Sequence, residues 1–439
     1  MKVMDREFTD TQLLRVLGVR QLATTIFNYT VGSGIFALPA IAVARLGAAA
    51  PLSYLICMLS MGLTLLCIAE AGSRVAVTGG VYAYIEAALG PLIGFAAGVL
   101  LFLVGLAGGA AVVVLFARTI GTFLGNQSTS LIDTLIVAIV ALFTIINVRG
   151  VRQSARAMEI ITIVKVLPLL AFIAVGICFV HPANWHWSTR PPLTALFGTA
   201  GVVIFAFTGI ESALAPSGEV RSPSRTVPIA SFLALGAATI LYLAIQWVAL
   251  GIQGPLLAQP SVTPLADATA TFAGPAGRTL MIAAATISIL GYMSANVLST
   301  PRSLFAFARD GFLPRSLALA HPRFHTPHVA ILAHCVAIAA LALSGTFEHL
   351  AIFSNLSAFL VYILVAIAVL RLRSRGIRLD GRPWVIPGGP IVPLATCLAN
   401  GWLIHATADS RDWLALSMVI AAALLLYAIR ALRLRGGSS

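Results

Sequence analysis

The sequence predicts an all-α membrane protein, and three observations support this prediction: the composition, the length of the apolar runs and the placement of the basic residues. Of the 439 residues, 59% are hydrophobic and 10% are charged, whereas a soluble domain carries about 25% charged residues. This composition excludes a water-soluble enzyme and a disordered chain. Alternating apolar segments of roughly ten residues, typical of a membrane β-barrel, are absent from the sequence.

Twelve apolar runs are long enough to cross a bilayer, for which a helix needs about 20 mostly apolar residues. We therefore expect twelve transmembrane helices in one membrane domain that covers residues 1–439. The connection at about 253–275 is the longest on the outer side and has room for a short helix. The runs lie at about 20–44, 50–73, 91–125, 131–148, 157–180, 194–218, 229–252, 276–308, 328–344, 348–370, 388–406 and 412–433.

The basic residues predict the orientation of these helices. With the N-terminus in the cytoplasm, 22 of the 28 Lys and Arg residues fall on the inner side and five on the outer side, while Lys165 lies within the membrane. Loops rich in Lys and Arg stay in the cytoplasm, so we expect a multi-pass protein of the cytoplasmic (inner) membrane with both termini inside. Because most Arg residues lie in short loops between apolar runs, the net charge of +13 does not indicate nucleic-acid binding.

No cofactor or metal ion is expected. The five cysteines lie inside apolar runs without a CxxC pair, and the His-containing segments HPANWH and HPRFHTPH lack Cys or acidic partners at the spacing of a zinc site. The sequence has no nucleotide-binding loop and no nucleophile–base motif, so an ATP-driven pump and an intramembrane enzyme are not expected. The oligomeric state stays open between a monomer and a homodimer.

Two of the apolar runs carry residues that interrupt a helix. Gly32, Ser33 and Gly34 fall in the middle of the first run, and Thr208 and Gly209 fall near the middle of the sixth. Two interruptions five helices apart are typical of transporters built from two inverted repeats. We therefore expect one repeat at about 20–180 and a second at about 194–370, with helices 11 and 12 at about 388–433 outside them.

A broken membrane helix leaves N–H and C=O groups that must meet a ligand or line a cavity. The half-helix after the break presents N–H groups and a positive dipole, and the half-helix before it presents carbonyls. A zwitterion satisfies both sets. We expect the amides of Gly32–Gly34 to bind its carboxylate, and the carbonyls around Ile26, Phe27 and Phe205–Phe207 to bind its ammonium group.

Four segments resemble the signature segments of the amino acid–polyamine–organocation (APC) permeases. Their order and spacing also match, and the similarity runs from about Arg15 to Arg435. The sequences of these segments are most similar to those of the bacterial amino acid permease and antiporter branch. The resemblance implies a twelve-helix, five-plus-five inverted-repeat (LeuT-type) fold with discontinuous first and sixth helices, and secondary transport by alternating access. The segments are VGSGIFALPA, TGGVYAYIEAALGP, FAFTGIESALAPSGEVRSPSRTVPIA and RSLFAFARDGFLP.

The resemblance also implies roles for particular residues. Gly32, Ser33 and Gly34 match the carboxylate-binding motif of the family, and Phe205 matches an aromatic gate over the substrate. Glu211 lies deep in an apolar helix, where an ionisable residue indicates function by default. Its carboxylate either pairs with a cationic substrate, carries a proton, or braces the broken helix through hydrogen bonds.

Lys165 is the only deeply placed cation in a chain that has 26 Arg residues and only one other Lys, Lys2. A buried Lys can lose its proton, whereas Arg in proteins cannot. Some APC members keep a Lys at this position, where it takes the place of a sodium ion beside the first and eighth helices. We expect Lys165 to couple transport to protons or to fix the ion-independent state of an exchanger; the alternative is a Lys that extends to the inner surface.

Further polar residues in the apolar runs either line the pocket for the substrate side chain or form hydrogen bonds between helices. They are Asn28, Tyr29, Thr208, Tyr292, Asn296, Ser354, Asn355 and Ser357.

The sequence therefore predicts a secondary active transporter that moves neutral or cationic amino acids across the cytoplasmic membrane, either coupled to protons or by exchange. The alternatives are a polyamine or basic amino acid antiporter, and a non-transporting channel or sensor on the same fold. Its partners would be a small amino acid, protons in the coupled case, and the lipid bilayer.

Overall fold

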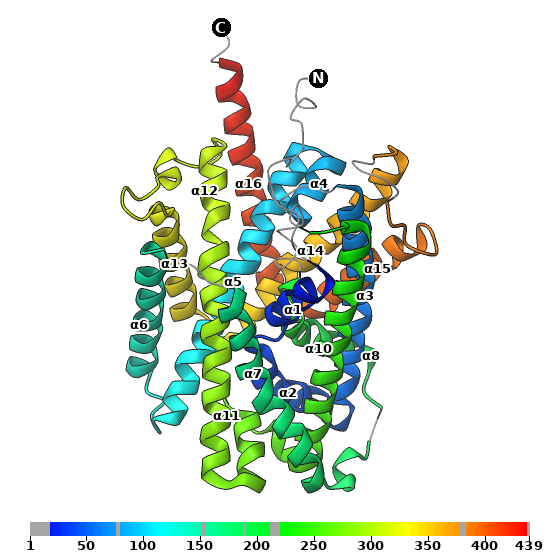
Figure 1. Ribbon diagram of the computed structural model, residues 1–439, viewed down its shortest axis with the longest axis vertical. Helices are drawn as coiled ribbons and strands as arrows, with labels where there is room; N and C mark the ends of the chain where they lie inside the picture. Colours follow the sequence, from blue (N-terminus) through cyan, green and yellow to red (C-terminus); the bar gives the residue numbers. More distant parts are fainter. Residues whose placement is uncertain are drawn as a thin grey trace.

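The computed structural model describes residues 18–75, 80–150, 155–187, 190–210, 220–377 and 383–436. In this part of the chain most residues are helical, and the longer helices run roughly along the long axis of the molecule (Figure 1). The helix α4 (Val81–Leu89) and the last turns of α16 (Ser410–Gly436) lie at one end, which we call the α4 end. The connection from α10 (Pro223–Gln253) to α11 (Pro264–Ser299) lies at the opposite end.

Most helices coincide with the predicted apolar runs. The first run divides into α1 (Val19–Thr30) and α2 (Gly34–Leu46), and the described part of the sixth into α8 (Leu193–Val203) and the 3₁₀ turn η4 (Ile204–Ala206). Eight helical segments of the described residues are long and apolar enough to cross a membrane, and three further apolar helices are shorter. The other helices on the predicted runs are α3 (Ala50–Arg74), α5 (Pro91–Phe123), α6 (Thr129–Val148), α7 (Ala155–Gly176), α10, α11, α13 (His328–Ser344), α14 (Phe347–Ser374), α15 (Ile391–Thr407) and α16.

Two predicted connections contain helices. The first is α4, between α3 and α5, and the second is the beginning of α11, which starts at Pro264 rather than near residue 276. Ala and Leu favour a helix here even though polar residues lower the mean hydropathy. Gly274, with φ at 62° and ψ at −160°, bends α11. Across this bend Arg278 Nε lies 3.1 Å from Asp267 Oδ1, so an ion pair joins the two parts. After α11 the chain continues into α12 (Pro301–Arg309).

Close helix packing surrounds the centre of the molecule. The helix α5 packs along α14, and α10 packs against both α1 and α3. Glycines in α5 permit this approach, since a Cβ atom at Gly105 would lie 2.4 Å from Thr300 Oγ1. The absence of a side chain at Gly105 therefore lets α5 pack closely against Thr300.

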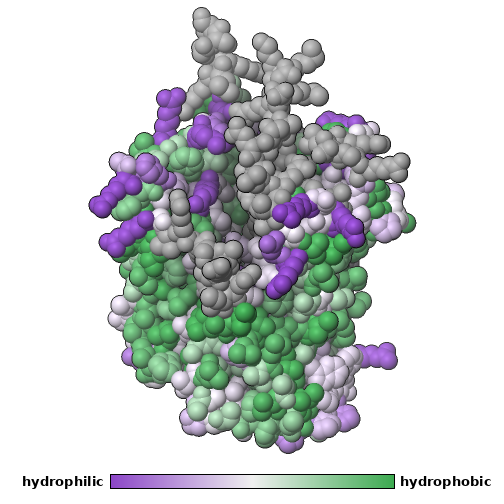
Figure 2. Space-filling model, viewed as in Figure 1, coloured by the Kyte–Doolittle hydropathy of each residue, from purple (hydrophilic) through white to green (hydrophobic). Residues whose placement is uncertain are grey.

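The surface is apolar where a bilayer would surround it. Leu398 on α15 is 75% exposed and Ile240 on α10 is 71% exposed. Figure 2 shows a broad hydrophobic surface over the middle of the molecule, with hydrophilic residues gathered toward the α4 end. Because a soluble protein would bury such side chains, this surface fits a protein that is embedded in lipid.

Candidate functional site

The first helix breaks at the centre of the molecule. Ordinary helix ends at Thr30 and resumes at Gly34, and residues 31–33 between them are not helical. The Val31 N–H donates to Phe27 O at 2.8 Å, and the Gly32 N–H turns back to Thr30 O at 2.8 Å. Ser288 Oγ of α11 donates to Gly32 O at 3.0 Å, so a side chain satisfies the carbonyl that the break exposes.

A second break follows α8. The turn η4 ends at Ala206, and residues 207–209 form a turn instead of continuing the helix. Gly209 has φ at 106°, a conformation that other residues rarely adopt. Thr208 Oγ1 donates to Phe205 O at 2.9 Å, which replaces a lost helical hydrogen bond.

The two breaks lie against each other. A Cβ atom at Gly34 would lie 3.2 Å from Ala206 Cα, and one at Gly209 would lie 3.1 Å from Tyr29 O. Tyr242 of α10 lies beside both breaks: its hydroxyl is 2.8 Å from Thr30 O and 2.9 Å from Ala206 O. Since a hydroxyl carries one proton, these two carbonyls share it, and Tyr242 links the two unwound segments.

A small cavity of about 10 Å³ lies where the breaks meet. The Phe205 ring lines it and packs edge to face on Phe347, at the start of α14, with ring centroids 5.7 Å apart. Gly108 of α5 packs closely against Tyr292, because a Cβ atom at Gly108 would lie 2.9 Å from the Tyr292 hydroxyl. The lining residues are Tyr29, Thr30, Gly32, Ser33, Gly34, Phe205, Ala206, Thr208 and Tyr292.

Backbone amides beside this cavity are the groups that can bind a charged ligand. The N–H groups of Ser33, Gly34 and Ile35 form no hydrogen bond with any residue that the structure describes. They stand at the start of α2, where the helix dipole adds partial positive charge. Such an arrangement binds an anionic group such as a carboxylate.

Lys165 approaches the first break from α7. Its side chain is 2% exposed, and its Nζ donates to Asn28 O at 2.6 Å. Asn28 lies in the last turn of α1, so an ammonium group stands at the negative end of that helix. This placement differs from that of a Lys that extends to the surface.

The structure brings together some of the predicted site residues and separates others. Tyr29, Gly32–Gly34, Phe205, Thr208 and Tyr292 all line the cavity. The side chains of Ile26 and Phe207 are fully buried outside the lining set. Glu211 lies outside the described residues.

Three of the other polar residues predicted for the pocket bind neighbouring helices, whereas Ser357 Oγ donates to Phe353 O in its own helix at 3.1 Å. Asn296 Nδ2 donates to Gly105 O at 2.8 Å, and its Oδ1 lies 3.2 Å from His334 Nε2. Ser354 Oγ donates to Val104 O at 3.0 Å, and Asn355 Nδ2 donates to Gly201 O at 2.9 Å. These contacts fit the alternative that the sequence also allowed, hydrogen bonding between helices.

Sequence reasoning missed Tyr242 and Ser288, which bind the carbonyls of the two breaks. The signal available was weak, because each is a single polar group in a long apolar run (TILYLAI and ATISIL). Only the fold brings Tyr242 to Thr30, which is 212 residues away along the chain.

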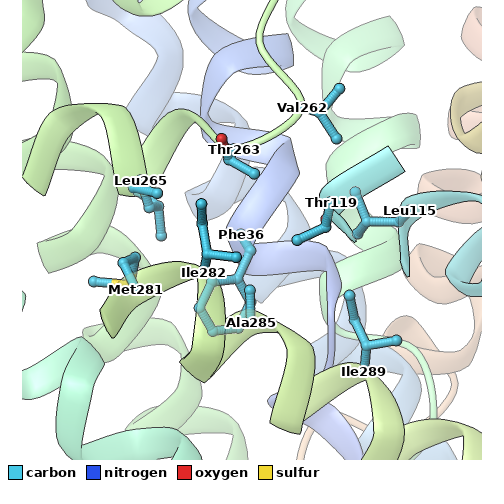
Figure 3. Close-up of a pocket in the computed structure, with 11 residues that line it drawn as sticks. Phe36, Leu115, Thr119, Val262, Thr263, Leu265, Met281, Ile282, Ala285 and Ile289 are labelled. Carbon is cyan, nitrogen blue, oxygen red and sulfur yellow. The ribbon is translucent and has the colours of Figure 1, made fainter. Parts of the chain in front are cut away.

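A second cavity lies between α2, α5 and α11, and Figure 3 shows its lining. Phe36, Leu115 and Ile289 are among its apolar walls, and Thr119 and Thr263 are its only polar lining residues. With no charged group in its lining, it offers little to bind a zwitterion.

Two broken helices, a buried cavity between them and a surface suited to lipid define a membrane transporter. The chain belongs to the amino acid permease family, whose model matches residues 17–430. It is therefore a permease and not an enzyme.

Relatives of this chain differ in the substrate that their names give. The methylthioribose transporter of Bacillus subtilis is 28% identical over 97% of this chain and 95% of its own length. The branched-chain amino acid permease of the same organism is 27% identical over 94% of this chain and 93% of its own. Cationic amino acid transporter 4 of Mus musculus is 28% identical over 89% of this chain and 65% of its own.

Proposed function

We propose that this protein is a secondary active transporter of small neutral amino acids, with the substrate bound between the two broken helices. The observation that carries the proposal is the group of amides at Ser33, Gly34 and Ile35, which have no partner among the described residues. Ser33 and Gly34 line the cavity. The substrate carboxylate binds these amides. Its ammonium group binds carbonyls at the ends of α1 and η4.

The lining of the cavity supports a neutral substrate. Its side chains are aromatic, aliphatic or hydroxyl-bearing, and none of the described lining residues is charged. Phe205 and Tyr292 present apolar surface to the substrate side chain. A cationic amino acid is the second candidate, because Glu211 follows the second break in the sequence and some relatives carry cationic amino acids in their names.

Lys165 is the proposed coupling group. In its charged form the ammonium holds α1 against α7 through Asn28 O. Loss of the proton weakens this contact, so the position of α1 depends on protonation. A ligand or proton shifts a conformational equilibrium only through such a difference between states. Without a proton gradient, the same site would support exchange.

The proposed architecture has twelve spans, with α1–α7 and α8–α14 as two inverted repeats and α15 and α16 outside them. The equivalent breaks after α1 and at η4 support this arrangement. In the proposed orientation the α4 end faces the cytoplasm, as the Lys and Arg distribution requires. Alternating access then moves the broken helices against α5, α6, α11 and α13.

The decisive experiment is reconstitution of the purified protein into liposomes with a panel of labelled amino acids, including leucine, alanine, arginine and a polyamine. The expected result is saturable uptake of a neutral amino acid, increased by a pH gradient that is acidic outside. The same panel tests exchange when unlabelled substrate is placed inside. Saturable transport of arginine or polyamine alone would contradict the neutral-substrate proposal, and absence of any saturable flux would contradict the transporter mechanism.

A further inference from the structure

A hollow of about 680 Å³ opens at the end of the molecule opposite α4. It lies between the end of α5, the start of α6, the end of α13 and the loop at residues 260–262. This hollow is separate from the central cavity and shares no lining residue with it. Its volume is in the range of sites that enclose a small organic molecule.

Two opposite charges face the hollow without neutralising each other. Arg118 of α5 is exposed and Asp133 of α6 is half-buried, and both line it. Neither forms an ion pair with any residue in the described part of the chain. The first turn of α6 begins at Thr129, which also lines the hollow, and its first three N–H groups have no backbone partner among the described residues.

The carboxylate of Asp133, at its position on α6, needs a partner of opposite charge. The helix α6 has 20 residues, so its length of about 30 Å just matches the hydrocarbon core. Asp133 lies four residues after the start of α6, about 6 Å along the helix from its first residue. A carboxylate on a membrane-spanning helix is costly unless a cation accompanies it.

The lining also changes from polar to apolar with depth. Thr122, Gln127 and Thr129 surround the mouth, whereas Val114 and Ile136 lie one or two turns deeper along α5 and α6. Leu343 of α13 lines the hollow and is 47% exposed. A phospholipid has the same order of chemistry from headgroup to acyl chain.

We propose that this hollow binds a zwitterionic phospholipid with a primary ammonium headgroup, such as phosphatidylethanolamine. Arg118 and the first amides of α6 bind the phosphodiester, because a guanidinium matches phosphate with two hydrogen bonds. Asp133 binds the ammonium, and an acyl chain lies along Ile136 and Leu343.

The bound lipid would contact the loop that leads into α11. Val262 lines both this hollow and the apolar cavity of Figure 3, so the loop separates the two. Ser261 in the same loop is hydrogen bonded to Asp267, the partner of Arg278. The lipid therefore joins α5 and α6 to the bent start of α11.

Native mass spectrometry of the purified full chain tests the proposal. The protein is offered equal amounts of phosphatidylethanolamine, phosphatidylcholine and phosphatidylglycerol, and the retained lipids are counted. We expect phosphatidylethanolamine to be retained about tenfold over phosphatidylcholine, whose methylated ammonium donates no hydrogen bond, since one charge-assisted hydrogen bond changes affinity by about this factor. Asp133→Asn should remove this preference, and Arg118→Gln should lower retention of both lipids.

Two matched variants and one soluble ligand complete the test. Asp133→Glu keeps the charge and should keep the preference, and Arg411→Gln, at the same end of the molecule but outside the hollow, should change nothing. An unchanged preference in Asp133→Asn, or none in the wild type, would overturn the proposal. If soluble phosphoethanolamine raised the unfolding temperature as much as phosphatidylethanolamine does, the assignment to a lipid would be overturned. None of these readouts uses transport, so their failure is distinct from failure of the proposed function.

Discussion

The carboxylate of Glu70 in α3 and the guanidinium of Arg373 in α14 form a two-point ion pair at the α4 end of the molecule. Arg373 Nε lies 2.8 Å from Glu70 Oε1, and Arg373 Nη2 lies 2.6 Å from Glu70 Oε2. Glu70 is fully buried and also accepts the Ile386 N–H at 2.9 Å and Arg74 Nε at 2.9 Å. One carboxylate thus joins α3, α14 and the segment that precedes α15.

Replacing Glu70 should destabilise the protein more than replacing Arg373. Glu70→Gln leaves two guanidinium groups beside a neutral amide, and breaking a buried pair costs about 3–5 kcal/mol. Arg373→Gln leaves the carboxylate with Arg74, so we expect a smaller loss. Thermal unfolding of the purified variants measures both. The exposed Arg371 on the same helix provides the control, Arg371→Gln. Equal midpoints for Glu70→Gln and wild type would show that the cluster does not hold α14.

Removal of the Tyr242 hydroxyl should reduce transport. Tyr242→Phe leaves the carbonyls of Thr30 and Ala206 without their shared donor, which costs about 1–3 kcal/mol and separates the two breaks. Initial uptake rates in liposomes should fall by about tenfold. Tyr54 packs edge to face on Tyr242 with centroids 6.4 Å apart, and its buried hydroxyl has no hydrogen-bond partner among the described residues. Tyr54→Phe should therefore leave uptake unchanged; a loss as large as that of Tyr242→Phe would refute the bridging role.

A methyl group at the second break should abolish transport. Gly209→Ala strains a backbone with φ at 106° and places Cβ 3.1 Å from Tyr29 O. Both effects push the two breaks apart, so we expect uptake below about a tenth of wild type. Gly236 in α10 has open space around its Cβ position, and Gly236→Ala should preserve uptake and add up to about 1 kcal/mol of stability. Normal uptake by Gly209→Ala would contradict the proposed site.

Substitutions at Lys165 should separate proton coupling from exchange. Lys165→Arg keeps the charge beside Asn28 O but cannot release its proton. We expect this variant to exchange substrate yet lose uptake driven by a pH gradient. Lys165→Met removes the donor and should lose gradient-driven uptake as well. Gradient-driven accumulation by Lys165→Met at the wild-type level would exclude a coupling role for Lys165. Counterflow measured in the same vesicles confirms that each variant is folded.

Hydropathy alone located the long helices of the described residues. The predicted run at 50–73 corresponds to the helix Ala50–Arg74, and the run at 328–344 corresponds to the helix His328–Ser344. A helix that crosses lipid must be apolar along its length, and the sequence shows this property directly. The sequence also located Gly32–Gly34 at the non-helical centre of the first run, because small residues in a spanning helix are a local feature.

Partners across the molecule required the tertiary structure. The sequence allowed a short helix in the connection at about 253–275 but did not predict that it begins at Pro264 and continues into α11, since a helix outside the lipid need not be apolar. Tyr242 beside Thr30, and Glu70 beside Arg373, depend on how helices distant in the chain pack together. The sequence by itself determined where the long apolar helices lie and where the first of them breaks, because these depend on the composition of short segments. Only the tertiary structure decided which side chains satisfy the exposed backbone, because a hydrogen bond depends on positions within about 3 Å, which no local pattern encodes.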